Sequence, residues 1–381
     1  MEFNFNKKTK KENFMENRIP SGCAVFGIFN QSGSKFNGNA VLEGISMMHD
    51  RSNGLGGGFA AYGIYPELKD EWAFHFIFED LIAKKQSEDI MEDNFEIVYS
   101  EKIPTNNKVK VQDPPLLFRY FLRVKSNLKE SEEDFVVNFV ISVNSNIRGA
   151  YIISSGKNMG IFKGVGFPED IGQYFKIDEY EGYLWTAHGR FPTNSVGWWG
   201  GAHPFGLLNW SVVHNGEISS YGTNKRFVND FGYKCTLSTD TEVITYLFDL
   251  LNRKQKIDIK LIHLILASPL WEEIERMPTG LRVLAKNLRM LYGSSLVNGP
   301  FNIIVGHNNF MYALNDRIKL RPMVAARDGA FLYISSEEAA IRKVCSSPEL
   351  LWHPDGGEPV FGMLDKLQND NNQLKDLAAL S

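Results

Sequence analysis

The chain is poor in the features that mark several large protein classes. It has only three cysteines, Cys23, Cys235 and Cys345, in 381 residues. That number is too small and odd for a disulfide framework, which indicates a reducing compartment such as the cytoplasm. No apolar run reaches the roughly 18 residues of a membrane span, and the N-terminus lacks the apolar stretch of a signal peptide. We therefore expect a cytoplasmic protein that does not enter the membrane.

Basic charge and metal-binding motifs are also missing. The 41 Lys and Arg residues against 45 Asp and Glu residues give a net charge of −4, without the basic surplus that nucleic-acid binding normally needs. His188, His203 and His214 fall on separate expected strands without zinc-type spacing, and no CxxC, HExxH, GxSxG or P-loop motif is present. We expect no nucleic-acid partner and no bound metal, and instead a small ligand or a protein partner.

What is present indicates a large, well-packed globular core. Hydrophobic residues make up 43% of the chain and aromatic residues 13%, including 27 Phe, which is ordinary to rich for a folded domain. Residues 1–22 carry five Lys or Arg, show no periodicity and end in Pro-Ser-Gly, so we interpret them as a leader. The folded part is expected to begin at Cys23, with a polar tail at 364–381.

Alternating and helical patterns predict the elements between these ends. Strands are expected at 23–30, 72–78, 95–102 and 116–124 and in several later runs, and helices at 79–92, 131–146, 241–251 and 258–292. The segment 67–147 differs in pattern from its surroundings and predicts an inserted α+β subdomain. Strand pairs at both ends of the chain with helices between them favour sheets covered by helices over a parallel doubly wound fold.

Cys23 opens an apolar strand, in SGCAVFGI. One interpretation is a small buried hydrophobe. The other is a nucleophile that becomes N-terminal when the leader is removed, because a free α-amine has a pKa near 7.7 to 8.0 and can serve as its general base. Cys235 and Cys345 have no companion motif and are expected to be packing residues.

Arg190 lies in HGRFPTNS, where an apolar strand ends at a Pro turn. It could be a surface residue, or its planar guanidinium could bind a carboxylate in a way that Lys cannot match. The glycines of GWWGG at 197–201 could hinge two indoles over a small ligand, or form an ordinary surface loop.

Asn215 and Gly216 lie between apolar alternations in VVHNGEI. Asn-Gly in this setting is a strong signal for a type I′ hairpin turn. The alternative is an oxyanion hole, in which the Asn215 amide and the Gly216 N–H point at one developing negative oxygen.

Asp240 lies in STDTEV, just before an apolar helical run. Thr239 with Glu242 fits a capping box, which alone would explain the segment. Asp240 could also present its carboxylate to a substrate ammonium group.

Taken in this order, the four segments resemble those of the class II glutamine amidotransferases, members of the N-terminal-nucleophile hydrolase superfamily. The resemblance runs from about Ser21 to Gly362 and is specific at SGCAVFGI, HGRFPTNS, AHPFGLLNWSVVHNGEI and STDTEV. Within that class the chain is most similar to the stand-alone amidotransferase subunit of archaeal-type glutamate synthase. The resemblance implies a four-layer αββα sandwich over 23–363, and it is weakest in the 67–147 insertion.

The resemblance also implies roles for individual residues. Cys23 is the nucleophile and its freed α-amine the base, and Asn215 with Gly216 forms the oxyanion hole. Arg190 binds the α-carboxylate of L-glutamine and Asp240 its α-ammonium group. Thr193 helps to shape the carboxylate pocket.

The implied reaction is hydrolysis of L-glutamine to glutamate and ammonia through a Cys23 thioester. It requires cleavage of the 22-residue leader before Cys23. After Asp240 only 141 residues follow in this sequence, fewer than a typical flavin barrel of about 250 residues. We therefore expect no cofactor in this chain and a separate synthase subunit carrying FMN and iron–sulfur clusters.

Three alternatives stay open from the sequence. The partner could be an N-methylglutamate synthase assembly instead of glutamate synthase. The chain could be an N-terminal-nucleophile acylase acting on another amide, or a non-catalytic regulatory subunit that keeps its leader.

Overall fold

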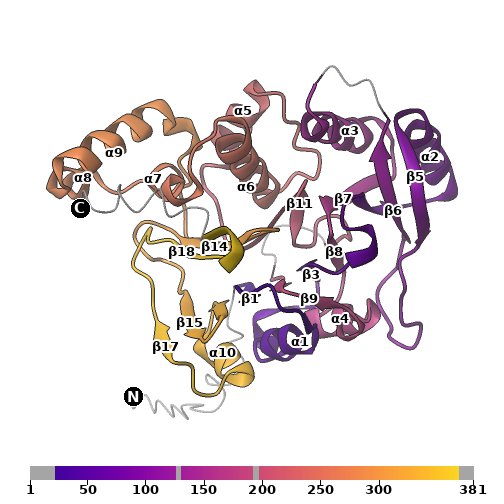
Figure 1. Cartoon of the computed structure of the whole chain (residues 1–381), viewed down its shortest axis with the longest axis horizontal. Coiled ribbons are helices and arrows are strands. Elements are labelled where there is room, and N and C mark those ends of the chain that lie inside the picture. Colours follow the sequence, from indigo (N-terminus) through magenta and orange to yellow (C-terminus); the bar gives the residue numbers. More distant parts are fainter. Residues whose placement is uncertain (1–21, 126–129, 192–196, 369–381) are drawn as a thin grey trace, which may run out of the picture.

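A computed structural model describes residues 22–125, 130–191 and 197–368 (Figure 1). Its largest sheet has seven strands, all paired antiparallel. In spatial order they are β17 (Leu350–Trp352), β15 (Val324–Asp328), β16 (Phe331–Ser335), β1 (Ala24–Asn30), β10 (Leu184–Gly189), β3 (Gly57–Tyr62) and β8 (Met159–Gly164). The expected strand at 23–30 is thus confirmed as β1, at the centre of this sheet.

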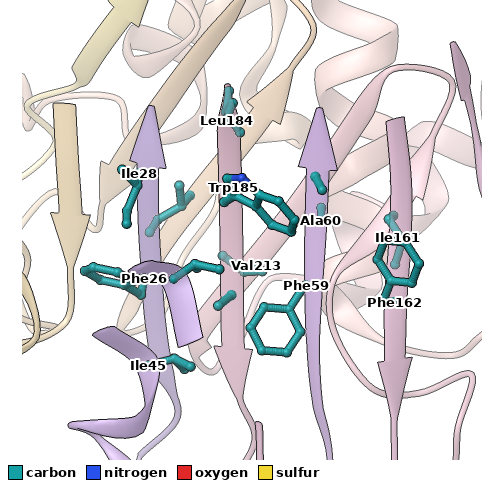
Figure 2. Packing of buried hydrophobic residues seen from close by; sticks show 14 of the residues in the cluster. Phe26, Ile28, Ile45, Phe59, Ala60, Ile161, Phe162, Leu184, Trp185 and Val213 are labelled. Carbon is teal, nitrogen blue, oxygen red and sulfur yellow. The ribbon is translucent and has the colours of Figure 1, made fainter. Parts of the chain in front are cut away.

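A second antiparallel sheet of five strands packs against the first. Its strands in order are β11 (Phe205–Leu207), β12 (Trp210–Gly216), β13 (Phe301–His307), β14 (Phe310–Asn315) and β18 (Val360–Met363). Val213 of β12 belongs to the same hydrophobic core as Phe26, Phe59 and Trp185 of the larger sheet, and Figure 2 shows it lying among their side chains.

Strand β1 is buried along its whole length because both of its faces are covered. Successive side chains of a strand point to opposite faces. A Cβ built on Gly27 would lie 2.9 Å from the Met311 sulfur, and one built on Gly44 of α1 would lie 2.0 Å from the Phe26 ring. The second sheet therefore lies against one face of β1 and α1 against the other, with glycine at each close approach.

Helices α1 (Asn39–Ser46), α4 (Pro168–Tyr174) and α10 (Glu338–Val344) contact the seven-stranded sheet. Helix α6 (Asp240–Phe248) contacts β11 and β12 of the five-stranded sheet, and α5 (Tyr221–Asp230) packs on α6. Figure 1 shows α5 and α6 on the opposite side of the molecule from α1 and α4. The expected mixture of helices with several antiparallel sheets is confirmed, and the four-layer αββα description stays a prediction.

A third sheet is built largely from the segment expected as an insertion. Its strands in order are β5 (Phe95–Lys102), β6 (Leu116–Val124), β4 (Trp72–Phe78) and β7 (Ala150–Lys157), with helices α2 (Leu81–Asn94) and α3 (Glu132–Asn146). Strand β7 begins after residue 147. The hydrophobic core of this sheet is continuous with the core under β12 and α6.

The helical pattern expected at 258–292 forms as separate short helices. They are α7 (His263–Leu266), α8 (Trp271–Arg276) and α9 (Thr279–Leu291). The breaks coincide with Pro269 and Pro278, since proline interrupts a helix interior and is tolerated only near its start.

The remaining elements are short. They are β2 (Phe36–Asn37) paired with β9 (Glu181–Gly182), α11 (Asp365–Gln368), a π-helix (Asp249–Lys254) and the 3₁₀ segments His49–Arg51, Pro66–Leu68, Ile177–Glu179, Ile259–Leu261 and Gly293–Ser295. None of the helices in the described part of the chain has the length and apolarity needed to span a bilayer.

Candidate active site

Cys23 lies immediately before β1, next to the start of the loop that follows β10. The pairing of β1 with β10 places Ala24 opposite Gly189. The Phe191 N–H therefore reaches Cys23 and donates to its sulfur at 3.3 Å. Arg51 Nε donates to the Cys23 carbonyl oxygen at 3.3 Å. One contact thus holds the thiol and the other holds the backbone of Cys23, at the N-terminal end of a central strand.

The surroundings of Cys23 do not ionise its thiol. Burial raises the pKa of the thiol, and this effect exceeds the opposing effects of the Phe191 N–H, Arg190 and Arg321, while Asp240 raises the pKa further. A thiolate is the reactive form of cysteine. A separate base would therefore be needed to take the thiol proton.

Two guanidinium groups, those of Arg51 and Arg321, lie close to Gly22. A Cβ built on Gly22 would lie 3.0 Å from Arg321 Nη1 and 3.3 Å from Arg51 Nη2. Arg51 is also paired with Glu337 at 2.8 Å. Neither Arg51 nor Arg321 lies in a motif with Cys23, so neither was expected near it.

Asn215 and Gly216 are in an extended strand and not in a hairpin turn. Both are paired with β13, Asn215 opposite Asn302 and Gly216 opposite Phe301, so the type I′ alternative is wrong. Gly216 has φ +142°, and a Cβ there would lie 1.9 Å from the Pro300 oxygen. Only glycine fits this close approach of two strands.

The Asn215 side chain is fully buried beside the start of the folded chain. Its Nδ2 donates to Ser336 Oγ at 3.2 Å. Its Oδ1 lies 3.6 Å from the position of a Cβ on Gly22. Within the described residues no donor reaches Oδ1. The amide therefore lies between Ser336 on one side and the Gly22–Cys23 peptide on the other.

Arg190 is held by its backbone at the end of β10. Its N–H donates to the Gly56 carbonyl at 2.8 Å, and its own carbonyl accepts from Asn53 N–H at 3.2 Å and from Ser52 Oγ at 3.1 Å. The residue is 7% exposed, so the alternative that Arg190 is an ordinary surface residue is wrong. Burial lowers the pKa of its guanidinium, and the charges of Cys23 and Asp240 oppose that shift.

Asp240 is the first residue of α6, and half of the expected capping box is formed there. Thr239 Oγ1 accepts from Glu242 N–H at 3.2 Å. The Glu242 carboxylate does not return to Thr239 but accepts from the N–H groups of Thr236 and Leu237 at 2.9 and 3.0 Å. The cap therefore fixes the first turn of α6 and leaves the Asp240 carboxylate for other partners.

The Asp240 carboxylate stays charged although it is largely buried. Its Oδ2 accepts from Ile218 N–H and its Oδ1 from Thr241 Oγ1, each at 3.2 Å, and His214 Nδ1 lies 3.6 Å from Oδ1. Burial alone would raise the pKa, but His214 and these hydrogen bonds together hold the pKa below its usual value. An acidic group prepared in this way can hold a cation.

Three histidines that looked unrelated in the sequence form one buried cluster beneath Asp240. His203 Nε2 lies 2.7 Å from Thr241 Oγ1, and His203 Nδ1 lies 2.9 Å from His188 Nε2. His188 Nε2 also lies 2.9 Å from the His214 carbonyl oxygen. Burial lowers the pKa of His188 to about 3 and that of His203 well below its usual value, so both are neutral.

No metal arrangement accompanies this histidine cluster. In the ranges that the structure describes, no group of three or more His, Cys, Asp or Glu side chains is placed to hold a metal ion. The cluster links β10, β12 and α6; Asn215 lies in β12, Asp240 begins α6, and Arg190 directly follows β10.

Other predicted residues lie apart from the site or outside the described residues. Thr193 lies outside the described residues. Trp199 is 7% exposed and donates to the Gln112 carbonyl at 2.9 Å, so its indole is packed in the core and does not hinge over a ligand. Cys235 and Cys345 are free thiols packed against the hydrophobic cores, as expected of packing residues.

A family model described as "Glutamine amidotransferases class-II" matches residues 77–230. This range holds Arg190, Asn215 and Gly216 and excludes Cys23 and Asp240. A protein of Archaeoglobus fulgidus with uncharacterised function is 50% identical over 354 residues, which cover 91% of this chain and 94% of the relative.

More distant similarity reaches named amidotransferases. An amidophosphoribosyltransferase of Methanocaldococcus jannaschii is 24% identical over 194 residues, which cover 49% of this chain and 35% of that enzyme. The solved structure of glutamine phosphoribosylpyrophosphate amidotransferase from B. subtilis matches with a TM-score of 0.46 and 16% identity, covering 90% of this chain and 48% of that one. The chain thus spans less than half the length of either amidotransferase.

Proposed function

We propose that the chain is a class II glutamine amidotransferase, as the family model matching residues 77–230 suggests, and that it hydrolyses L-glutamine to glutamate and ammonia with Cys23 as its N-terminal nucleophile. The observation that carries the proposal is the convergence of four distant segments. The Phe191 N–H, next to Arg190, donates to the Cys23 sulfur, and Asn215 lies beside Gly22. Arg190 lowers and Asp240 raises the pKa of the Cys23 thiol.

The two charged residues fit the amino-acid end of the substrate. An α-amino acid carries a carboxylate and an ammonium group on one carbon, so a guanidinium and a carboxylate are the minimal pair that fixes both. In this proposal Arg190 binds the α-carboxylate and Asp240 the α-ammonium group, and Thr193 contributes to the carboxylate pocket.

The reaction then proceeds in two steps at the γ-carboxamide. The free α-amine of Cys23 takes the thiol proton, and the sulfur attacks the amide carbon. Asn215 and Gly216 bind the negative oxygen of the tetrahedral intermediate. The C–N bond breaks, the leaving nitrogen takes the proton and departs as ammonia, and water then hydrolyses the thioester to glutamate and regenerates the thiol.

The proposal requires that the chain be cut between Gly22 and Cys23, because the α-amine does not exist before cleavage. We further propose that the ammonia passes to a separate synthase subunit that carries FMN and iron–sulfur clusters, with glutamate synthase as the acceptor and an N-methylglutamate synthase as the closest alternative. A reducing cytoplasm, in which Cys23 stays a free thiol, is the expected compartment.

The test is a substrate comparison on chain that begins at Cys23. We expect glutamate and ammonia from L-glutamine, and little hydrolysis of a primary amide that lacks the α-carboxylate and α-ammonium groups. Cys23→Ala should abolish the reaction, whereas Cys235→Ala, which removes a thiol that only packs, should keep it. If glutamine hydrolysis is tightly coupled to the use of ammonia by the synthase subunit, the hydrolysis rate should rise when that subunit is added.

Two results would replace this function with its alternatives. Equal hydrolysis of amides with and without the α-groups would identify an acylase of another specificity. No hydrolysis, with no labelling of Cys23 by a thiol-reactive glutamine analogue, would identify a non-catalytic subunit.

A further inference from the structure

Ser336 joins the strand of the nucleophile to the strand of the oxyanion hole. It follows β16 and is 2% exposed. Its N–H donates to the Val25 carbonyl at 3.0 Å, and its Oγ accepts from the Val25 N–H at 3.2 Å. The same Oγ is the partner of the Asn215 amide at 3.2 Å. A single hydroxyl therefore contacts both the residue two places after Cys23 and Asn215.

The hydrogen bonds around this hydroxyl are unbalanced as they stand. Two donors, the Val25 N–H and Asn215 Nδ2, point at one oxygen, while Asn215 Oδ1 is buried with no donor from any described residue. A buried acceptor without a partner is unfavourable. Asn215 Oδ1 is an acceptor that lacks a donor, and the Ser336 hydroxyl has a hydrogen that it could donate.

A half-turn of the Asn215 amide about its Cβ–Cγ bond gives Oδ1 a donor, the Ser336 hydroxyl, and gives that hydroxyl an acceptor. The two ends of an amide have nearly the same shape, so the half-turn needs no extra room. Ser336 Oγ would then accept from Val25 and donate to Asn215 Oδ1. Asn215 Nδ2 would take the place beside the Gly22–Cys23 peptide that Oδ1 now occupies.

We propose that Ser336 is a positioning residue that selects this orientation of Asn215, with its N–H₂ group facing the reacting carboxamide. The inference rests on the proposed function, because only a reaction that develops a negative oxygen needs a donor there. An oxyanion donor acts best when its direction is set before the reaction, so that no reorganisation occurs in the transition state. In this arrangement Nδ2 replaces Oδ1 as the atom of the Asn215 amide that has no partner among the described residues, and it can donate to the substrate oxygen.

The test compares glutamine hydrolysis by Ser336→Ala with that of the parent chain beginning at Cys23. Without the hydroxyl, neither end of the amide is selected, so we expect kcat to fall roughly 10- to 100-fold with little change in KM. This is less than the roughly 100- to 1000-fold effect of losing an oxyanion donor altogether. Ser336→Thr keeps a hydroxyl and should recover most of the turnover.

Ser335→Ala is the matched control for the loss of a buried hydroxyl. Ser335 is the neighbouring residue, is also buried, and accepts from the Glu337 N–H at 3.1 Å without a contact to Asn215. Its removal should leave kcat close to the parent value. Thermal unfolding of both variants shows whether either has lost folded protein.

A double variant separates positioning from general damage. If Ser336 acts through Asn215, then in an Asn215→Ala background Ser336→Ala should lower kcat no further. Independent effects that multiply in the double variant, or a Ser336→Ala enzyme with parental kcat, would overturn the inference. A parent that does not hydrolyse glutamine at all would instead refute the proposed function, and this inference with it.

Discussion

The residues around Cys23 determine which group could take the proton of its thiol. Burial raises the pKa of the Cys23 thiol despite the nearby positive charges of Arg190 and Arg321, so the sulfur depends on a base to become a nucleophile. His188 and His203 are neutral but lie in the buried cluster beneath Asp240, and their ring nitrogens contact one another, Thr241 and a backbone carbonyl. The proposed mechanism assigns the role of base to the α-amine that cleavage before Cys23 would free.

Replacing Asn215 tests the oxyanion role at the level of one side chain. We expect Asn215→Ala to lower kcat about 100- to 1000-fold with little change in KM, because its amide would engage the substrate oxygen only as negative charge develops. Steady-state kinetics with L-glutamine measure both values. A large rise in KM at unchanged kcat would contradict the assignment.

Asn224→Ala is a matched control for that variant. Asn224 is also fully buried, and its amide donates to the carbonyls of Ser294 and Leu296. It removes the same group at a structural position remote from Cys23. Its folded fraction should retain parental kcat, even if the protein melts at a lower temperature.

The sequence predicted the residues that lie in recognisable motifs and missed those that meet them only in space. Cys23 and Arg190 lie next to the ends of strands, Asn215 lies within a strand and Asp240 begins a helix, and each of these elements has a readable pattern. Arg321 and Ser336 are about 300 residues from Cys23 in the chain. They reach it only because β16 pairs with β1 and the loop before β15 returns to the same edge, which no local pattern encodes.

At the level of elements, the sequence predicted several strands with correct bounds, but it missed a helix and suggested a turn that does not form. The bounds of β5 and β6 agree with the predicted 95–102 and 116–124. Helix α5 was not predicted, because it is polar and buries only Asn224 and Val228. The Asn-Gly pair at 215–216 has the local signature of a hairpin, but the pairing of Ser211 to Gly216 with β13 overrides it.

Position 216 in β12 has no room even for the methyl group of alanine. Gly216→Ala would place a Cβ against the Pro300 oxygen at a φ that L-residues rarely adopt, so we expect a loss of at least about 2 kcal/mol in the free energy of unfolding. Urea denaturation measures the loss. An Ala variant as stable as the parent would mean that the strands do not approach so closely.

Gly280→Ala is the matched substitution without a clash. Gly280 lies in α9, and a Cβ there meets nothing within 4 Å. Alanine favours a helix over glycine, so this variant should gain up to about 1 kcal/mol. The opposite signs of the two Gly→Ala changes separate local geometry from a general effect of the substitution.

At the scale of the whole molecule, two sheets and α6 meet at the buried histidine cluster, which makes the fold sensitive to acid. Burial lowers the pKa of His188 from 6.5 to about 3 in the folded chain. Below pH 6.5, His188 binds a proton in the unfolded chain but stays neutral in the folded chain. The stability from this histidine is therefore complete above about pH 6.5 and is lost progressively as the pH falls toward 3.

The expected slope can be measured by urea unfolding at pH 7.5 and pH 5. One histidine with this shift costs about 1.4 kcal/mol per pH unit below 6.5, or about 2 kcal/mol at pH 5. His188→Asn should lose roughly that much less stability between the two pH values than the parent. The exposed His353→Asn is the control and should follow the parent; an unchanged slope for His188→Asn would contradict the prediction.

The proposed mechanism depends on whether residue 23 is the N-terminal residue of the active protein, which the intact mass of that protein measures directly. We predict a mass that corresponds to a chain beginning at Cys23, with glutaminase activity confined to that species. A chain that still carries residues 1–22 and turns over glutamine at the full rate would contradict the account, because its Cys23 nitrogen would be an amide and could not act as the base.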